Sequence, residues 1–300
     1  VAHWTPEWKD MPEGMQLCRV IVDGGLGGHS GLDVHKGRCN CNRELAVFLT
    51  KFYGEVTPDQ ALVCAFNGGT ANASIASTAE AVLAIAPAAL DTLKSLAAQH
   101  DAQLKAAYAE KDPALSVRVE EAAPCHKYLG NGLDLVRCLG ELPCNVIEMH
   151  EQMKGVVMTS NNIGVVRTLD DDITVSCHTR SFSNDDMHAI GDAIKATCLA
   201  CKASGVDLIM DTGSWFEDPN STLLETTYNT FKDVLGFEPK KVAIHAVLEC
   251  AYFVQKYPGV QIASIGPLII EPHSTSERVN LNTADDIWRV TIELLKRLKD

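Results

Sequence analysis

The chain has 300 residues, of which 46% are hydrophobic, 22% charged and 6% aromatic, so it can bury a core and is not predominantly disordered. Its 39 acidic and 26 basic residues give a net charge of −13, which argues against nucleic acid as a partner. Its apolar stretches are shorter than the roughly 20 residues that cross a bilayer, so no membrane span is predicted.

Strands and helices alternate through the first two thirds of the chain. The pattern predicts strands at 15–22, 61–66 and 79–85, and helices at 40–52, 87–111 and 134–139. It also predicts a hairpin of strands 155–168 and 172–178 with its turn at 169–171, a helix at 184–201 and a strand at 206–210. These elements indicate one α+β domain.

The last 90 or so residues have a different pattern, typical of a parallel sheet. Short apolar strands are predicted at 242–244 and 261–265, between a helix that Asn220 caps and a terminal helix at 284–298. So few strands cannot close such a sheet, because its edges and one face would stay open. We therefore expect residues 220–300 to pack against protein outside this chain.

The cysteines and the N-terminus bear on the compartment. Eleven cysteines, an odd number spread through apolar patterns, favour reduced thiols in a cytosolic or matrix-like compartment. Cys198 and Cys201 have a redox or zinc spacing but lie in a predicted helix, which favours core thiols. Because the chain begins at Val1 without a signal peptide, we interpret it as processed or as one piece of a longer polypeptide.

Two glycine clusters follow predicted strands, Gly27-Gly28-His29-Ser30-Gly31 and Asn67-Gly68-Gly69-Thr70. Each is either a structural turn or a loop that brings backbone and, at His29, an imidazole close to a ligand. Neither fits a nucleotide-binding loop, because no lysine and no helix start follow in register.

Three further positions have a functional and a structural interpretation. Arg180 ends an alternating strand, where its guanidinium would grip a carboxylate or form a surface ion pair. His245 and Glu249 have helical i, i+4 spacing and would share a metal or form a buried polar pair. His273 follows an apolar strand end and is a candidate metal ligand or acid-base group.

Taken in order, these motifs resemble the aminoacyl-histidine dipeptidases, also called cytosol non-specific dipeptidases, of the di-zinc aminopeptidase-like superfamily. The matching stretches span most of the chain: 27–31 with Gly37 and Asn40, 66–70, 154–157 with 164–166, Arg180-Ser181, Trp215 with Pro219 and Ser221, His245 with 248–250, and 264–267 leading to 272–274.

The resemblance implies an α/β protein in which an α+β lid is combined with part of a zinc-peptidase catalytic domain. Residues 1–14 would be an N-terminal linker, 15–211 the lid and dimerisation domain, and 212–300 the C-terminal segment of the catalytic domain. The implied partners are a dipeptide substrate, a second copy bound through the lid, and a missing catalytic half or another protein.

The resemblance also assigns roles to individual residues. His273 would be the last zinc ligand, Arg180 the clamp for the substrate's C-terminal carboxylate, and Gly69 and Thr70 part of the substrate site. His29 would stabilise the oxyanion, as a lid residue that reaches the partner subunit's site. Two zinc ions belong to the complete family site, and this chain alone is not expected to bind them.

The sequence departs from the family pattern at several points. It has no His-x-Asp motif, which in the family supplies upstream zinc ligands; residues 71–76 replace a more polar segment, and Val247 and Ala251 replace glycines. Two hypotheses follow: the C-terminal portion of a zinc dipeptidase, or an inactive dipeptidase-like subunit with a structural or dimerising role. The expected location is the cytoplasm, or an organelle matrix after N-terminal processing.

Overall fold

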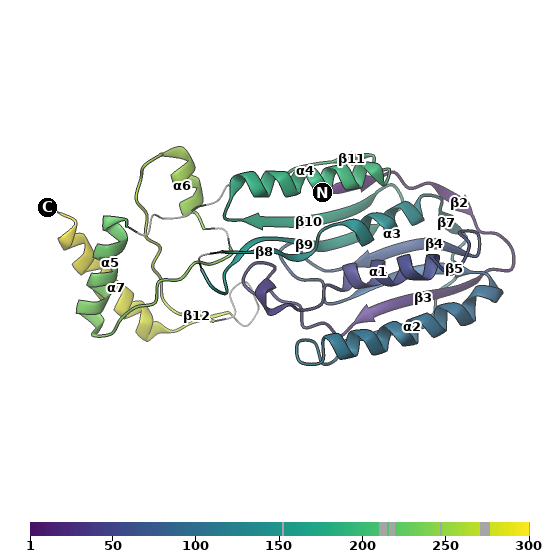
Figure 1. Ribbon diagram of the computed structural model, residues 1–300, viewed down its shortest axis with the longest axis horizontal. Helices are drawn as coiled ribbons and strands as arrows, with labels where there is room; N and C mark the ends of the chain where they lie inside the picture. Colours follow the sequence, from purple (N-terminus) through teal and green to yellow (C-terminus); the bar gives the residue numbers. More distant parts are fainter. Residues whose placement is uncertain (152, 210–214, 216–219, 247, 271–276, 300) are drawn as a thin grey trace. The chain divides into compact units, whose positions relative to one another are not determined.

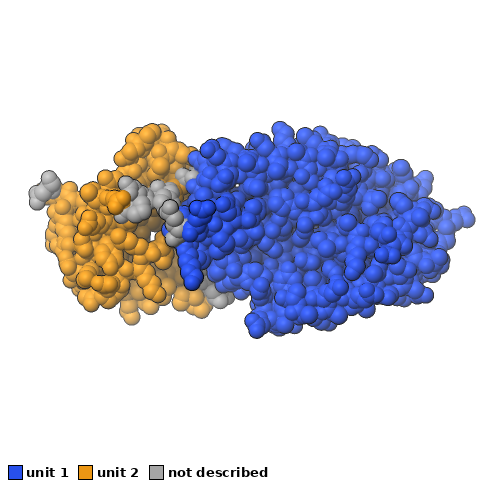
Figure 2. Space-filling view, in the orientation of Figure 1, with its two compact units in different colours: residues 1–211, 244–246 blue, residues 212–243, 247–300 orange. Residues whose placement is uncertain are grey.

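The computed structural model describes residues 1–300 except 152, 210–214, 216–219, 247, 271–276 and 300. Its contacts divide the chain into two compact units, which Figure 2 colours separately. Unit 1 comprises residues 1–211 with 244–246, and unit 2 comprises 212–243 with 247–300. Strands and helices occur together in unit 1, which confirms the α/β fold class.

Unit 1 is built on one sheet of nine strands in the order β11-β1-β10-β9-β4-β5-β3-β6, with β8 paired to β9. All of its strand pairs are antiparallel. The strands are β1 (Ala2–Trp4), β3 (Gln16–Asp23), β4 (Ala61–Gly68), β5 (Ala79–Ile85), β6 (Ser116–Glu121), β8 (Asn145–Met149), β9 (Val157–Thr168), β10 (Ile173–Ser181) and β11 (Gly205–Val206).

Four helices pack against this sheet, in the order α4, α3, α1, α2 across it (Figure 1). They are α1 (Cys41–Tyr53), α2 (Pro87–Ala107), α3 (Gly132–Glu141) and α4 (Asn184–Ala200). Local sequence sets their starts: Asn40 and Ser183 cap α1 and α4 through side-chain oxygens, and Pro87 opens α2. Between helices and sheet lies a core that includes fully buried Phe48, Phe52, Phe66 and Leu83.

The first 14 residues, expected to be a linker, contain two strands. β1 lies inside the large sheet between β10 and β11, and Trp4 is fully buried with its indole N–H donating to the carbonyl of Cys201. β2 (Trp8–Asp10) pairs with β7 (Lys127–Leu129) as a separate two-stranded ribbon. Sequence periodicity could not reveal β1, because three residues carry no period and its partners are far along the chain.

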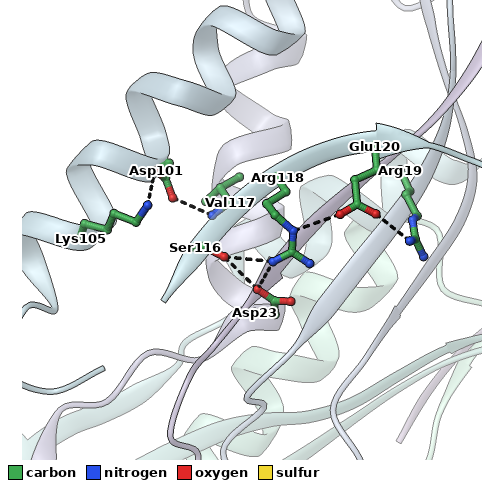
Figure 3. Close-up of polar contacts among 8 residues, drawn as sticks. All are labelled: Arg19, Asp23, Asp101, Lys105, Ser116, Val117, Arg118 and Glu120. Carbon is green, nitrogen blue, oxygen red and sulfur yellow. Dashed lines mark hydrogen bonds and ion pairs between the residues drawn. The ribbon is translucent and has the colours of Figure 1, made fainter. Parts of the chain in front are cut away.

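Strand β6, at one edge of the sheet, carries an ion-pair network (Figure 3). Arg118 contacts Asp23 at 2.6 Å and Glu120 at 3.1 Å, and Arg19 contacts Glu120 at 2.6 Å. The hydrogen bond from Arg118 lowers the pKa values of both Asp23 and Glu120. Charged side chains on an edge strand discourage pairing with another sheet, so this network protects the β6 edge.

The cysteines of unit 1 are free thiols, and those of the Cys198-x-x-Cys201 pair are buried in the core, as predicted. The Cys198 Sγ lies 3.7 Å from the Sγ of Cys138 on α3. Contact between two buried thiols on neighbouring helices is core packing.

Unit 2 contains α5 (Thr222–Leu235), α6 (Cys250–Lys256), α7 (Leu281–Arg297) and the two-residue strands β12 (Ile269–Ile270) and β13 (Arg278–Val279). Helices α5 and α7 pack together, and Ser221, not Asn220, caps α5. The predicted strands at 242–244 and 261–265 are absent: these described residues have no regular secondary structure. A strand of a parallel sheet forms only beside neighbouring strands, and the described part of unit 2 provides none for them.

We expect amides 261–267 of this chain to exchange hydrogen rapidly, because they have no ladder partner in the described structure. Large apolar side chains nearby are also open, with Val242 74% and Leu268 52% exposed. Hydrogen exchange measured by mass spectrometry checks this, with β4 and β5 as the protected internal control. Strong protection of 261–267 in an isolated monomer would contradict the expectation that other protein completes this region.

Candidate functional site

The buried guanidinium of Arg180 is the centre of the candidate site. Arg180 lies near the end of β10, opposite Ser160 on β9, and is only 8% exposed. Its Nε has no hydrogen-bond partner among the described residues, and burial lowers the pKa of the guanidinium, which nevertheless stays charged. A buried cation is costly unless an anion compensates its charge, so a bound anion would stabilise Arg180.

Two imidazole rings lie close enough to Arg180 for its positive charge to change their pKa values. Burial, together with the positive charge of Arg180, lowers the pKa of both His178 and His245 to about 4. His29 contributes further to the lowering at His178. Both rings are therefore neutral at pH 7, and Arg180 is the fixed positive charge among them.

His245 is held by a hydrogen bond at 2.8 Å between its Nε2 and the Ser160 Oγ, and its ring lies 5.7 Å from that of Phe182. The i, i+4 spacing of His245 and Glu249 does not place them on one helix in the structure. Helix α6 begins at Cys250, and His245 precedes it in non-helical chain, bonded to β9.

His29 lies on the loop after β3 with a defined tautomer. Its Nδ1 accepts hydrogen bonds from the backbone N–H groups of Gly31 and Leu32 at 3.1 and 3.0 Å, which puts the ring proton on Nε2. Its backbone N–H donates to the Asp33 carboxylate at 2.8 Å, and the residue also pairs with Ser74 across the loops. His29 is therefore oriented to donate a hydrogen bond through Nε2.

Gly31 brings the His29 loop very close to Arg180. A Cβ built on Gly31 would collide with the carbonyl oxygen of His245 and lie 3.0 Å from the Arg180 Nε. Only glycine fits there without displacing one of the two. This contact brings the sequence-predicted residues His29 and Arg180 into one neighbourhood.

Gly31→Ala is expected to lower the free energy of unfolding by about 1–3 kcal/mol, the usual cost of an overpacked position. Urea unfolding of the variant measures this. The matched control is Gly191→Ala in α4, where a Cβ meets nothing within 4 Å and helix propensity predicts about 1 kcal/mol of stabilisation. Equal stability of the two variants would contradict the close approach at Gly31.

Two further sequence-predicted residues, Gly69 and Thr70, lie on the loop that pairs with His29 through Ser74. Gly69 has φ +70, and a Cβ there would collide with the carbonyl of Gly164. A glycine at this position therefore allows the 69–76 loop to pack directly against β9. Thr70 is exposed on that loop. His273 lies outside the described residues, and within the described part of the chain no group of three or more metal-binding side chains occurs. The described residues therefore do not by themselves form a zinc site.

Ser160 and His178 were not among the residues predicted for the site, and His245 was considered only together with Glu249. One signal was available, since His178 and Arg180 are two residues apart on a strand and so share a face. The contact of His245 with Ser160 joins residues 85 positions apart, which no local pattern reveals.

Residues 14–112 match the family described as "Peptidase dimerisation domain". The chain is 33% identical over 294 residues to the cytosol non-specific dipeptidase of Escherichia coli K12, a match that covers 96% of this chain. It also matches the crystal structure of the aminoacylhistidine dipeptidase from Vibrio alginolyticus with a TM-score of 0.86, 25% identity and 100% coverage of this chain.

The chain is similar in sequence and in fold to the aminoacyl-histidine dipeptidases. It spans 59% of the length of the Escherichia coli dipeptidase and 61% of the Vibrio dipeptidase chain. The family resemblance and the fold class inferred from the motifs are thereby confirmed. No helix in the described residues has the length and apolar character of a membrane span.

Proposed function

We propose that this chain is part of a dipeptidase in which Arg180 binds the C-terminal carboxylate of a small dipeptide. The single observation that carries the proposal is the buried guanidinium whose Nε lacks a partner among the described residues. The planar fork of arginine matches a carboxylate with two parallel hydrogen bonds, and burial strengthens both. Similarity to the aminoacyl-histidine dipeptidases supports peptide-bond hydrolysis as the reaction.

The neighbouring imidazoles would have distinct tasks. His178 and His245 stay neutral beside Arg180, so they present hydrogen-bonding groups to the substrate without adding charge. His29 has its proton on Nε2 and would donate it as a hydrogen bond to the oxygen that becomes negative during attack on the peptide carbonyl. In this proposal residues 1–211 are the lid, because β1 belongs to its sheet, and 212–300 are the C-terminal segment of the catalytic domain.

The metal requirement is a separate part of the proposal. The complete family site is expected to hold two zinc ions, with His273 as one ligand. The described residues do not assemble such a site, and the roles proposed for Arg180 and His29 do not depend on the ions. A cytoplasmic location and a homodimer likewise remain predictions, supported by the Escherichia coli relative's name and by the matching dimerisation domain.

The test compares hydrolysis of dipeptides with hydrolysis of their C-terminal amides by the full-length protein. If Arg180 binds the carboxylate, the free acids are cleaved much faster than the amides. Zinc analysis of the natively purified protein accompanies the assay, with about two ions per subunit expected. Absence of both hydrolysis and zinc would instead favour the structural, non-catalytic subunit.

A further inference from the structure

Unit 1 contains a contiguous half, 16–121, with a complete sheet order of its own; we call it the inserted half. Along the chain it runs β3, α1, β4, β5, α2, β6. In the sheet its strands lie in the order β4-β5-β3-β6. Numbered along the chain within this half, they are strands 2, 3, 1 and 4. This is the β-α-β-β-α-β arrangement of ferredoxin-like folds.

The rest of the sheet repeats that arrangement. It consists of β1 and of 132–206, which we call the outer half, and it runs β1, α3, β9, β10, α4, β11, with β8 as an addition. Its spatial order is β9-β10-β1-β11, again second, third, first and fourth. The inserted half thus interrupts the outer half between its first strand and first helix, and the β2–β7 ribbon carries the chain in and out.

The two halves meet through equivalent elements, as two copies do in a symmetric dimer. The second strands, β4 and β9, pair antiparallel at Gly68 and Val166, and the first helices, α1 and α3, pack together. Figure 1 shows the mirrored helix order that results, α4, α3, α1, α2. An isologous contact pairs the same element of each partner, which is the arrangement seen here within one chain.

Side-chain hydrogen bonds supplement a short strand ladder at this junction. The β4–β9 ladder has one register pair, while the Asn67 side chain accepts from the Thr168 N–H at 2.9 Å, and Arg167 donates to the Gly68 carbonyl at 2.8 Å. From α1, the Asn42 amide donates to the Ile163 carbonyl at 3.1 Å. Such side-chain bonding is typical of an interface between two folded pieces.

The candidate site lies across this junction. His29 follows the first strand of the inserted half, whereas Arg180 lies near the end of the third strand of the outer half. The equivalent positions on the opposite side follow β1 and end β5, at 5–10 and 84–86, and contain neither histidine nor arginine. Only one of the two equivalent sites therefore has an imidazole and a guanidinium.

We infer that unit 1 is a fused pair of equivalent halves, and that one chain supplies both His29 and Arg180 to the same substrate-binding site. The expectation that His29 reaches the partner subunit's site is replaced by this assignment. Gly31, two residues from His29, approaches the Arg180 Nε of its own chain, as a same-chain site requires. The reaction at that site rests on the proposed function, but its assembly from one chain does not.

Mixed dimers of two defective full-length proteins test the assignment. Differently tagged His29→Ala and Arg180→Met chains are co-expressed, and the species carrying both tags is purified. If each site takes both groups from one chain, every site keeps a defect, and activity stays at the mean of the two parents. If His29 served the partner's site, one site in two would be intact, and recovery to about half of wild-type activity would overturn the inference.

A binding experiment separates this inference from the proposed function. If the wild-type protein hydrolyses no dipeptide, the proposed function fails, and N-acetylglycine serves as a carboxylate probe instead. Its Kd is measured through a dilution series that takes the full-length protein from dimer to monomer, or at one concentration if it is monomeric throughout. Undiminished binding to monomer supports the assignment; binding that vanishes with the dimer, or no binding, overturns it.

Discussion

Replacing Arg180 by lysine is expected to lower kcat/KM for dipeptides by roughly 5- to 150-fold, the equivalent of about 1–3 kcal/mol of transition-state stabilisation. A lysine offers one point charge where the guanidinium offers a planar fork, and its shorter reach leaves the buried Nε position empty. Steady-state kinetics of the full-length protein with free dipeptides and their C-terminal amides measure the effect. The loss should fall on the free acids, so that discrimination against amides narrows.

Arg137→Lys is the matched control, because Arg137 lies exposed on α3 and pairs with Glu141 four residues on. That variant should keep wild-type kinetics, and both variants should unfold at similar denaturant concentrations. If Arg180→Lys cleaves free dipeptides as well as the wild type does, Arg180 is not the carboxylate clamp.

Unit 1 is expected to lose stability as the pH falls from about 6.5 to about 4. His178 and His245 have folded-state pKa values of about 4, against about 6.5 unfolded, so the unfolded chain takes up protons first. The contribution is fully present above pH 6.5 and is lost as the pH falls through the folded-state pKa. A shift of this size corresponds to up to about 3 kcal/mol for each imidazole. Urea unfolding at several pH values measures the slope.

In Arg180→Met the free energy of unfolding should depend less steeply on pH. The substitution removes the positive charge that disfavours both imidazolium ions, while their burial persists. NMR titration of the two histidines should show both pKa values rising toward 6.5 in this variant. Arg137→Met, a surface change, should leave both where they are. Unaltered titration in Arg180→Met would mean that the guanidinium does not lie beside these rings.

Local sequence accounts for most elements of the inserted half, and long-range contacts account for what it misses. Helix α1 shows its buried stripe at Leu45, Phe48 and Phe52, and its cap at Asn40, within one short segment. Strand β1 has only three residues, and its partners are Val175 and Val206, so nothing near it in sequence marks it. At residues 261–265 the apolar pattern is present but the neighbouring strands are not, and no strand forms.

The residues of the candidate site also divide into those that the sequence predicts and those that only long-range contacts bring together. Spacing on one strand places His178 beside Arg180, and the family resemblance supplied the roles of His29 and Arg180. The contact between Ser160 and His245 depends on how distant segments meet, as does the approach of Gly31 to Arg180. Such contacts are products of tertiary packing and leave no periodic trace in the sequence.

The insertion of one half into the other has a consequence for how the chain acquires its structure. All strands and helices of the inserted half lie between residues 16 and 121, so it can fold as soon as that stretch has left the ribosome. The outer half must wait, because β1 at the N-terminus pairs with β10 and β11, which are made more than 160 residues later. Closing that long loop is slow, and β1 stays unpaired meanwhile. Refolding should therefore show two phases, an early one reported by the inserted half and a late one reported by burial of Trp4.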